Sequence, residues 1–172
     1  MRYRATRHAI LTALSEPAGE TCNIAYPDGS KMAYSDRVES NSPLKWHFPI
    51  GTRVPLNCTA SGKLFLSTLS ASRRLSIVQT IKLEKHAKNT ITDSEQLLRE
   101  INKIEKNRVS IDTEELYDGV VAVAVPITDK SGRFYGSLAI QAPAYRFDLD
   151  NKDYNLPLLR EAARNLSTLT ED

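Results

Sequence analysis

The sequence has only two cysteines, Cys22 and Cys58, among its 172 residues. Two cysteines cannot build a disulfide framework, and by themselves they cannot complete a metal site. Apolar runs of membrane-spanning length are missing, and the first residues lack the apolar segment of a signal peptide. These absences predict a cytoplasmic protein without membrane contact, whose cysteines are small buried hydrophobic residues in a reducing compartment.

Glycine, proline and excess charge are also scarce. With 7 Gly and 8 Pro, the composition excludes fibrous and disordered classes. The 23 basic and 21 acidic residues leave a net charge of +2, which argues against a broad nucleic-acid-binding or membrane-binding surface. The chain length fits one domain with a substantial core.

The first half of the chain predicts a helix followed by strands. Apolar positions at helical spacing indicate a helix over 2–15 that ends before the Pro and Gly of "EPAGE". Alternation on both sides of "PDGS" predicts a hairpin over 21–38, because Asp-Gly favours a tight reversal. "LKWHF" (44–48) places Leu44, Trp46 and Phe48 on one face and predicts a third strand.

Helices and then three further strands are expected in the rest of the chain. "TDSE" (92–95) fits a capping box that opens a helix. The run 120–125 is β-branched and apolar, which predicts a buried strand ended by Pro126. The other expected elements are helices from Thr59, over 70–81 and around 159–169, and strands over 109–111 and 133–141. This order predicts an α+β fold with a largely antiparallel sheet of about six strands flanked by helices.

"VPLNCTASGKLFL" (54–66) contains a Gly-Lys pair that invites comparison with a phosphate-binding loop. Such a loop needs a glycine where Asn57 stands and a Ser or Thr where Leu64 stands, so the pattern fails. Thr59 is instead a plausible helix cap, and Gly62 in the first turn would admit a second backbone or a small ligand. A cavity between sheet and helix is one interpretation and ordinary core packing is the other; the residues concerned are Trp46, Phe48, Val54, Ala60 and Ser61.

Signals of catalysis are sparse. The chain has no Gly-x-Ser-x-Gly elbow, and its three histidines are not at metal-binding spacing on a helix. Four carboxylates lie within 112–118: Asp112, Glu114, Glu115 and Asp118. They fit either general acid/base catalysis or a charged loop between two strands. No cofactor and no metal are predicted.

Several segments together resemble, in order and spacing, the effector-binding domain of IclR-family bacterial transcriptional regulators over roughly residues 10–168. They are "GETCNIAY" (19–26), "GTRVPLNCTASGKLFLSTLS" (51–70), "NTITDSEQLLREINKI" (89–104) and "DTEELYDGVVAVAVPITDKSGRFYGSLAIQAPAYR" (112–146). The resemblance implies a GAF-like fold that senses a small-molecule effector and assembles dimers or tetramers. In that family a separate N-terminal winged helix-turn-helix domain binds operator DNA.

Residues 1–15 would then be the end of an interdomain linker helix, and residues 16–172 the effector-binding domain. No DNA-binding domain fits before residue 10, so operator DNA would be contacted only through a domain that this chain lacks.

The resemblance also implies which residues form the effector pocket: Ala60, Ser61, Asp112, Val120, Ala122, Ala139 and Gln141. Members that resemble the glyoxylate- and pyruvate-sensing type carry Cys at the position of Ala122 and Ser at the positions of Ala139 and Gln141. Without these polar partners a short keto acid would leave oxygens unpaired. Trp46, Phe48 and Tyr135, wherever they face the cavity, would favour an aromatic or larger apolar effector.

Two functions are therefore carried forward. The first is a ligand-sensing domain that binds a small organic acid and controls transcription. The second is a small enzyme that acts on a carboxylated substrate with Asp112 and the nearby glutamates.

Overall fold

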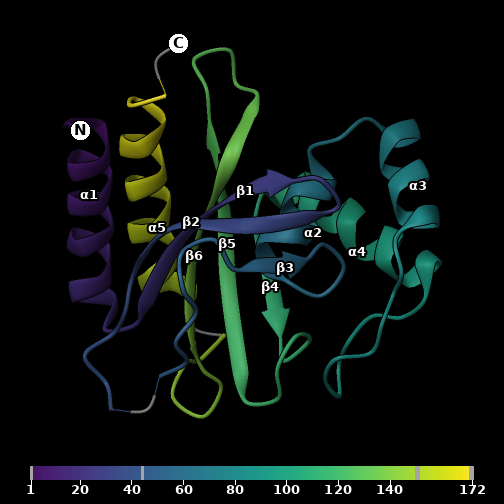
Figure 1. Ribbon diagram of the computed structural model, residues 1–172, viewed down its shortest axis with the longest axis horizontal. Helices are drawn as coiled ribbons and strands as arrows, with labels where there is room; N and C mark the ends of the chain where they lie inside the picture. Colours follow the sequence, from purple (N-terminus) through teal and green to yellow (C-terminus); the bar gives the residue numbers. More distant parts are fainter. Residues whose placement is uncertain (1, 44, 150–151, 171–172) are drawn as a thin grey trace.

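The computed structural model describes residues 2–43, 45–149 and 152–170 and shows one sheet between two groups of helices (Figure 1). All strand pairs are antiparallel, and the strand order is β3-β2-β1-β6-β5-β4. The predicted α+β fold with a six-stranded antiparallel sheet is confirmed. In chain order the elements are α1 (Arg2–Ala18), β1 (Thr21–Asp28), β2 (Lys31–Val38), β3 (Arg53–Pro55), α2 (Ala60–Ser67), α3 (Ala71–Thr80), α4 (Ser94–Asn107), β4 (Ser110–Thr113), β5 (Val120–Thr128), β6 (Phe134–Pro143) and α5 (Lys152–Ser167).

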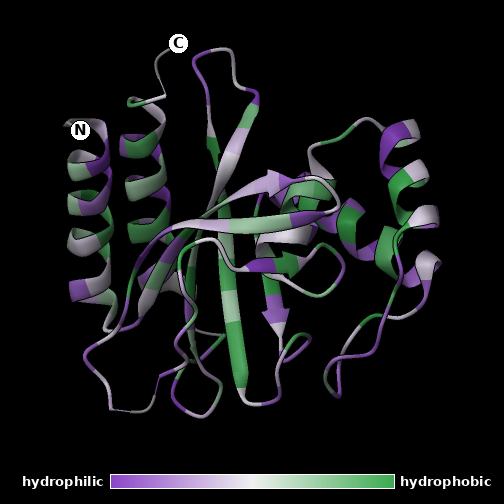
Figure 2. Cartoon of the chain, viewed as in Figure 1, coloured by the Kyte–Doolittle hydropathy of each residue, from purple (hydrophilic) through white to green (hydrophobic). Residues whose placement is uncertain are grey.

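The helices α1 and α5 lie side by side on one face of the sheet, and α2, α3 and α4 lie on the other (Figure 1). The α1 and α5 ribbons in Figure 2 carry both hydrophilic and hydrophobic bands, as expected of helices with one buried side. The core on this face is made of large side chains: Leu11, Leu14, Ile24, Val123, Val125, Ile127, Leu138, Ile140, Leu159 and Leu166.

The opposite face is built from smaller side chains at its centre. Alternate residues of β5 and β6 point towards α2, and three of them are alanines. Ala122, Ala124 and Ala139 pack against Ala60 and Leu64 of α2. Because alanine side chains are short, α2 can lie close to the sheet.

Gly62 sets the other contact that holds α2 in place. A Cβ atom at this position would lie 2.5 Å from both the Cα and the carbonyl oxygen of Leu56, which is closer than real Cβ contacts. The close approach that the sequence predicts at Gly62 is therefore present, and the group that approaches is the backbone of the preceding loop.

A β-bulge interrupts the hairpin of β1 and β2. Ile24 pairs with Asp36 and Ala25 pairs with Tyr34, so Ser35 is the extra residue. The bulge puts both Tyr34 and Arg37 on the α2 face, although they are three positions apart in the sequence. Asp36 lies on the other face, where its carboxylate is 3.0 Å from the Nε atom of Arg7 in α1.

The third strand predicted over 44–48 is wrong. Residues 45–48 have no regular secondary structure, residue 44 lies outside the described residues, and the strand that pairs with β2 is β3. The backbone carbonyl of Trp46 accepts a hydrogen bond from the Arg37 side chain rather than from a strand. Alternation alone could not show this, because side-chain contacts replace the strand ladder here.

Three predicted boundaries also shift. Helix α1 continues through Pro17 and ends at Ala18, and the next residue, Gly19, has a φ of +67° in the left-handed region. The cap of α4 is Asp93 rather than Thr92, since its carboxylate accepts from the Gln96 amide. Strand β5 continues through Pro126, which lies beyond the residues that pair with β4, so its missing N–H removes no hydrogen bond from the β4–β5 ladder.

The Gly62 contact predicts the direction in which a Gly62→Ala substitution changes the free energy of unfolding. In an exposed helix Gly→Ala would stabilise by up to about 1 kcal/mol. Gly62→Ala should instead lower the free energy of unfolding by about 1–3 kcal/mol, because the new methyl group meets a backbone that cannot move away alone. Urea denaturation measures it, with Ser76→Ala at an exposed position of α3 as the control. A stabilised Gly62→Ala protein would contradict this account of how α2 is placed.

Candidate functional site

The first turn of α2 forms one wall of the candidate site. Thr59 caps the helix: its hydroxyl accepts from the Gly62 amide at 3.0 Å, and its carbonyl accepts from the Lys63 amide. These two amides are therefore not exposed to a ligand, contrary to the expectation from the Gly-Lys pair. The amides of Ala60 and Ser61 are the ones that helix geometry leaves without an intrahelical partner.

Lys63 is the most deeply buried charged residue of the site. Its Nζ atom lies 2.6 Å from a carboxylate oxygen of Glu115 and 2.7 Å from the Ile111 carbonyl. The lysine is fully buried and Glu115 nearly so. The Gly-Lys pair thus supplies a glycine for close packing and a lysine for a buried ion pair. Sequence inspection missed this role because Glu115 is 52 residues away.

Asp112 lies in β4 opposite Ala122 and is 5% exposed. One of its carboxylate oxygens accepts from the Glu115 amide at 2.7 Å. Burial raises the pKa of Asp112 to about 7, because the charged form loses hydration. Burial therefore favours the neutral form of Asp112, next to the Lys63–Glu115 pair.

Arg37 reaches the same face from β2, beside Asn23 of β1. Its Nη1 atom donates to the side-chain oxygen of Gln141 at 3.1 Å, and its Nη2 atom donates to the Trp46 carbonyl at 2.9 Å. Burial lowers the pKa of the guanidinium. Sequence inspection missed Arg37, since without the bulge its face could not be assigned.

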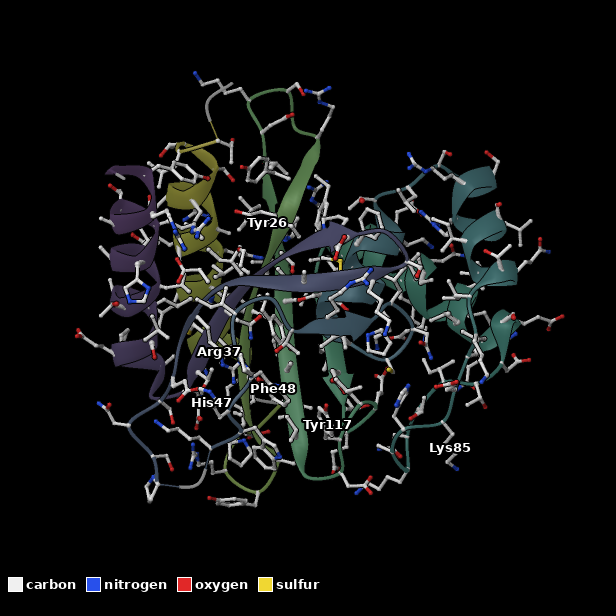
Figure 3. The ribbon with its side chains drawn as sticks, viewed as in Figure 1. Tyr26, Arg37, His47, Phe48, Lys85 and Tyr117 are labelled. Atoms are coloured by element: carbon white, nitrogen blue, oxygen red, sulfur yellow. The ribbon has the colours of Figure 1, made fainter. Side chains whose placement is uncertain are left out.

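Aromatic rings cover this end of the site. Phe48 is tilted against Tyr34 with ring centroids 6.2 Å apart, and it stacks on Tyr117 at 5.5 Å. Figure 3 shows Arg37, His47, Phe48 and Tyr117 near one another, with Tyr26 towards the opposite end of the sheet. Tyr135 packs edge-on against Tyr26 at 5.2 Å, so it does not face the site.

Buried polar atoms without a hydrogen-bond partner gather on the α2 face. Among the described residues there are five such side-chain atoms, and the strand register and contacts place four on this face. They are Asn23 Oδ1, Arg37 Nε, Ser110 Oγ and Glu115 Oε2; the fifth is Asn155 Oδ1 in α5. Leaving a buried polar group unpaired costs roughly 1–3 kcal/mol. This face therefore holds hydrogen-bond donors and acceptors that the folded chain does not satisfy.

The remaining sequence-predicted residues lie in several places. Ala60, Ala122 and Ala139 pack in one cluster between α2, β5 and β6. Ser61 is buried next to Ala60 in α2, Gln141 pairs with Ala122 in the sheet, and Val120 begins β5. Val54 packs into the hydrophobic cluster with Met32 and Tyr34. Trp46 is 37% exposed and contributes its backbone carbonyl. The space bounded by Arg37, Trp46 and Gln141 is small, about 10 Å³.

Other chemistry finds little support in the described part of the chain. No three His, Cys, Asp or Glu side chains among those residues are grouped to hold a metal ion. Cys22 and Cys58 are free and buried, as predicted. No helix in the described ranges is long and apolar enough to cross a membrane.

Comparison with known proteins gives a consistent result. The family profile "Bacterial transcriptional regulator IclR C-terminal" matches residues 1–168. The probable transcriptional regulator SauR of Cupriavidus necator is 40% identical over 159 residues, which are 92% of this chain and 63% of SauR. The chain spans between 50% and 63% of the length of the first curated relatives it matches.

Solved structures agree. The Thermotoga maritima IclR structure has a TM-score of 0.89 and 29% identity, covering 98% of this chain and 68% of its own. A double mutant of the PobR inducer-binding domain from Acinetobacter, solved with 3-hydroxybenzoic acid, has a TM-score of 0.86 and 26% identity. That alignment covers 95% of this chain and 96% of the PobR chain. The chain belongs to the IclR family of bacterial transcriptional regulators, as a C-terminal effector-binding domain.

Proposed function

We propose that the α2 face of the sheet binds a small organic acid, preferably an aromatic one, and that binding controls a DNA-binding domain carried elsewhere in the regulator. The observation that carries this proposal is the set of buried polar atoms without partners on that face. IclR-family domains of this type bind small-molecule effectors. A ligand that supplied the missing partners would satisfy these groups and gain affinity from their prior burial.

The aromatic preference rests on the lining of the site. Alanines at 122 and 139 offer apolar surface, and the rings of Tyr34, Phe48 and Tyr117 offer stacking partners. The PobR inducer-binding domain, which shares this fold, was solved with an aromatic acid, and this supports the same class here.

The wider function follows from the family. We propose that the domain self-associates into dimers or tetramers, that it acts in the bacterial cytoplasm, and that it contacts operator DNA only through another domain. Residues 1–15 would be the end of the linker helix to that domain. The enzyme alternative with Asp112 and the nearby glutamates does not hold, since the family consists of transcriptional regulators, which are non-enzymatic.

Calorimetric titration with a panel of acids tests the proposal. Benzoate, 3-hydroxybenzoate and 4-hydroxybenzoate should bind more tightly than pyruvate and glyoxylate, because the alanines cannot pair the oxygens of a short keto acid. Tighter binding of the short acids would refute the aromatic preference. If no acid in the panel bound at millimolar concentration, the acid-binding proposal itself would be wrong.

Asp112 makes stability depend on pH in a defined direction. Its folded pKa of about 7 is above the value of about 3.9 in an unfolded chain. Such a group stabilises the fold fully below its unfolded pKa, and this contribution is lost as pH rises towards and through 7. Between pH 5 and pH 8 the wild type should lose about 1–3 kcal/mol relative to Asp112→Asn.

Urea denaturation at pH 5, 6.5 and 8 measures this difference. Asp28→Asn is the control, because the Asp28 side chain is 55% exposed and pairs with Arg53 at the surface. The control should keep the pH slope of the wild type. Identical slopes for the wild type and Asp112→Asn would show that Asp112 is ionised throughout this range.

Ser61→Leu should abolish acid binding and leave self-association unchanged. Ser61 is buried at the first turn of α2, where a leucine would fill the space in front of the two amides left by the cap. Binding of 3-hydroxybenzoate and sedimentation of the same sample measure both properties.

Two variants control for indirect effects. Ser61→Ala removes only the hydroxyl group and should retain binding, and Ser72→Leu adds the same bulk at an exposed position of α3. Undiminished binding to a folded Ser61→Leu protein would exclude the first turn of α2 from the site.

A further inference from the structure

We propose that Arg37 is the residue that takes the acid group of the ligand, and that this contact releases the segment 45–48 from the guanidinium. The inference rests on the proposed acid-binding function and adds to it a specificity-determining residue and a moving part.

Arg37 differs from the other buried cations in its partners. Four cations in the described chain are at most 9% exposed, and three of them lie within 3.0 Å of a carboxylate oxygen. These three are Arg7 with Asp36, Lys63 with Glu115 and Arg74 with Glu105. Arg37 pairs only loosely with a carboxylate, since its Nε atom lies 3.9 Å from the carboxylate oxygen of Glu39.

The donors of Arg37 are correspondingly underused. The two hydrogen bonds that hold the guanidinium go to neutral oxygens, of Gln141 and of the Trp46 backbone, and Nε has no hydrogen-bond partner. A buried charge without a close counter-charge costs several kcal/mol. An anion bound here would remove part of that cost, and a carboxylate can accept two parallel N–H bonds from one guanidinium. The geometry therefore favours an anionic ligand over a neutral one.

The segment 45–48 occupies the place where such an anion would bind. The Trp46 carbonyl accepts a hydrogen bond from Nη2, and the centroid of the Phe48 ring is 5.2 Å from the guanidinium carbon. The Tyr34 ring is 5.7 Å from the same carbon, so two neighbouring aromatic rings border the guanidinium. The space beside it, about 10 Å³, holds roughly one water molecule. An acid can reach Nη2 only if Trp46 moves.

The segment is attached in a way that permits this movement. Residues 45–48 form no strand, and their side-chain bonds run to the chain just before them: His47 Nδ1 lies 2.6 Å and Lys45 Nζ 3.2 Å from the two carboxylate oxygens of Glu39. The Arg37–Trp46 hydrogen bond joins the segment to β2, and the Phe48 ring adds contacts with Tyr34 and Tyr117. A charge-assisted bond from Arg37 to a ligand carboxylate is stronger than its bond to the Trp46 carbonyl, so acid binding favours release of the segment.

The test compares an acid with its neutral isostere on the complete chain. Wild-type protein should bind 3-hydroxybenzoate at least about 10-fold more tightly than 3-hydroxybenzamide, given the strength of charge-assisted hydrogen bonds. Arg37→Gln should bind the two within about 3-fold of each other. The ligands differ only in carboxylate against carboxamide, and the variant has no guanidinium to distinguish these groups. Arg53→Gln, at an exposed arginine of β3, should keep the wild-type preference.

Trp46 is the only tryptophan, so its fluorescence reports the segment directly. The emission should change when the acid binds to the wild type and remain unchanged with the amide. Glu39→Gln provides a second variant that leaves Arg37 in place. Removing the nearest carboxylate should tighten acid binding by about 2–5-fold without tightening the amide, since exposed and partly exposed charges interact weakly.

Each result decides a separate point. An acid preference that survives in folded Arg37→Gln would overturn the role of Arg37 while leaving the acid-binding function intact. Should Arg37→Gln fail to fold, unchanged acid affinity in Glu39→Gln together with equal fluorescence responses to acid and amide would overturn it. Acid binding with constant Trp46 emission would refute the release of segment 45–48. No binding of any acid to the wild type would refute the acid-binding function and, with it, the role of Arg37.

Discussion

The close approach of α2 to the sheet is the constraint on which the rest of the site depends. It requires the absence of side-chain volume at two places, Gly62 against the Leu56 backbone and the alanines of β5 and β6 against the helix. With α2 held there, Lys63 is carried into the interior, and its charge must be met by Glu115. The position of Glu115 in turn orients Asp112 through a backbone hydrogen bond.

The two faces of the sheet have different physical roles. The face under α1 and α5 is filled by large aliphatic side chains, whose burial stabilises the fold through the hydrophobic effect. The face under α2 contains a buried ion pair, a buried arginine and a carboxyl group whose pKa is raised by burial. Buried charges are poor sources of stability, because desolvation offsets their attraction. The α1 face also holds a buried ion pair, Arg7 with Asp36, but four of the buried polar atoms without a hydrogen-bond partner lie on the α2 face. Unsatisfied buried groups fit a binding role better than a structural one.

A single bulged residue, Ser35, connects these two roles. It places Asp36 on the α1 side, where its carboxylate pairs with Arg7 and His8, and Arg37 on the α2 side. Burial raises the pKa of Asp36, but the hydrogen bonds from His8 and Arg7 outweigh it and leave the pKa lowered. Adjacent residues of one strand therefore tie α1 to the candidate site. Any movement of β2 would therefore change the contact of Asp36 with Arg7 and His8 of α1.

The sequence by itself determined the order of helices and strands, the antiparallel sheet and the cap at Thr59, since local periodicity and turn chemistry carry that information. Resemblance of motifs located the α2 turn, Asp112, Ala122 and Gln141 near one another. Only the tertiary structure showed that residues 45–48 are not a strand and that the polar groups of the site include Arg37, Lys63 and Asn23. Their roles depend on a one-residue bulge and on partners up to 104 positions away, and no local pattern encodes either.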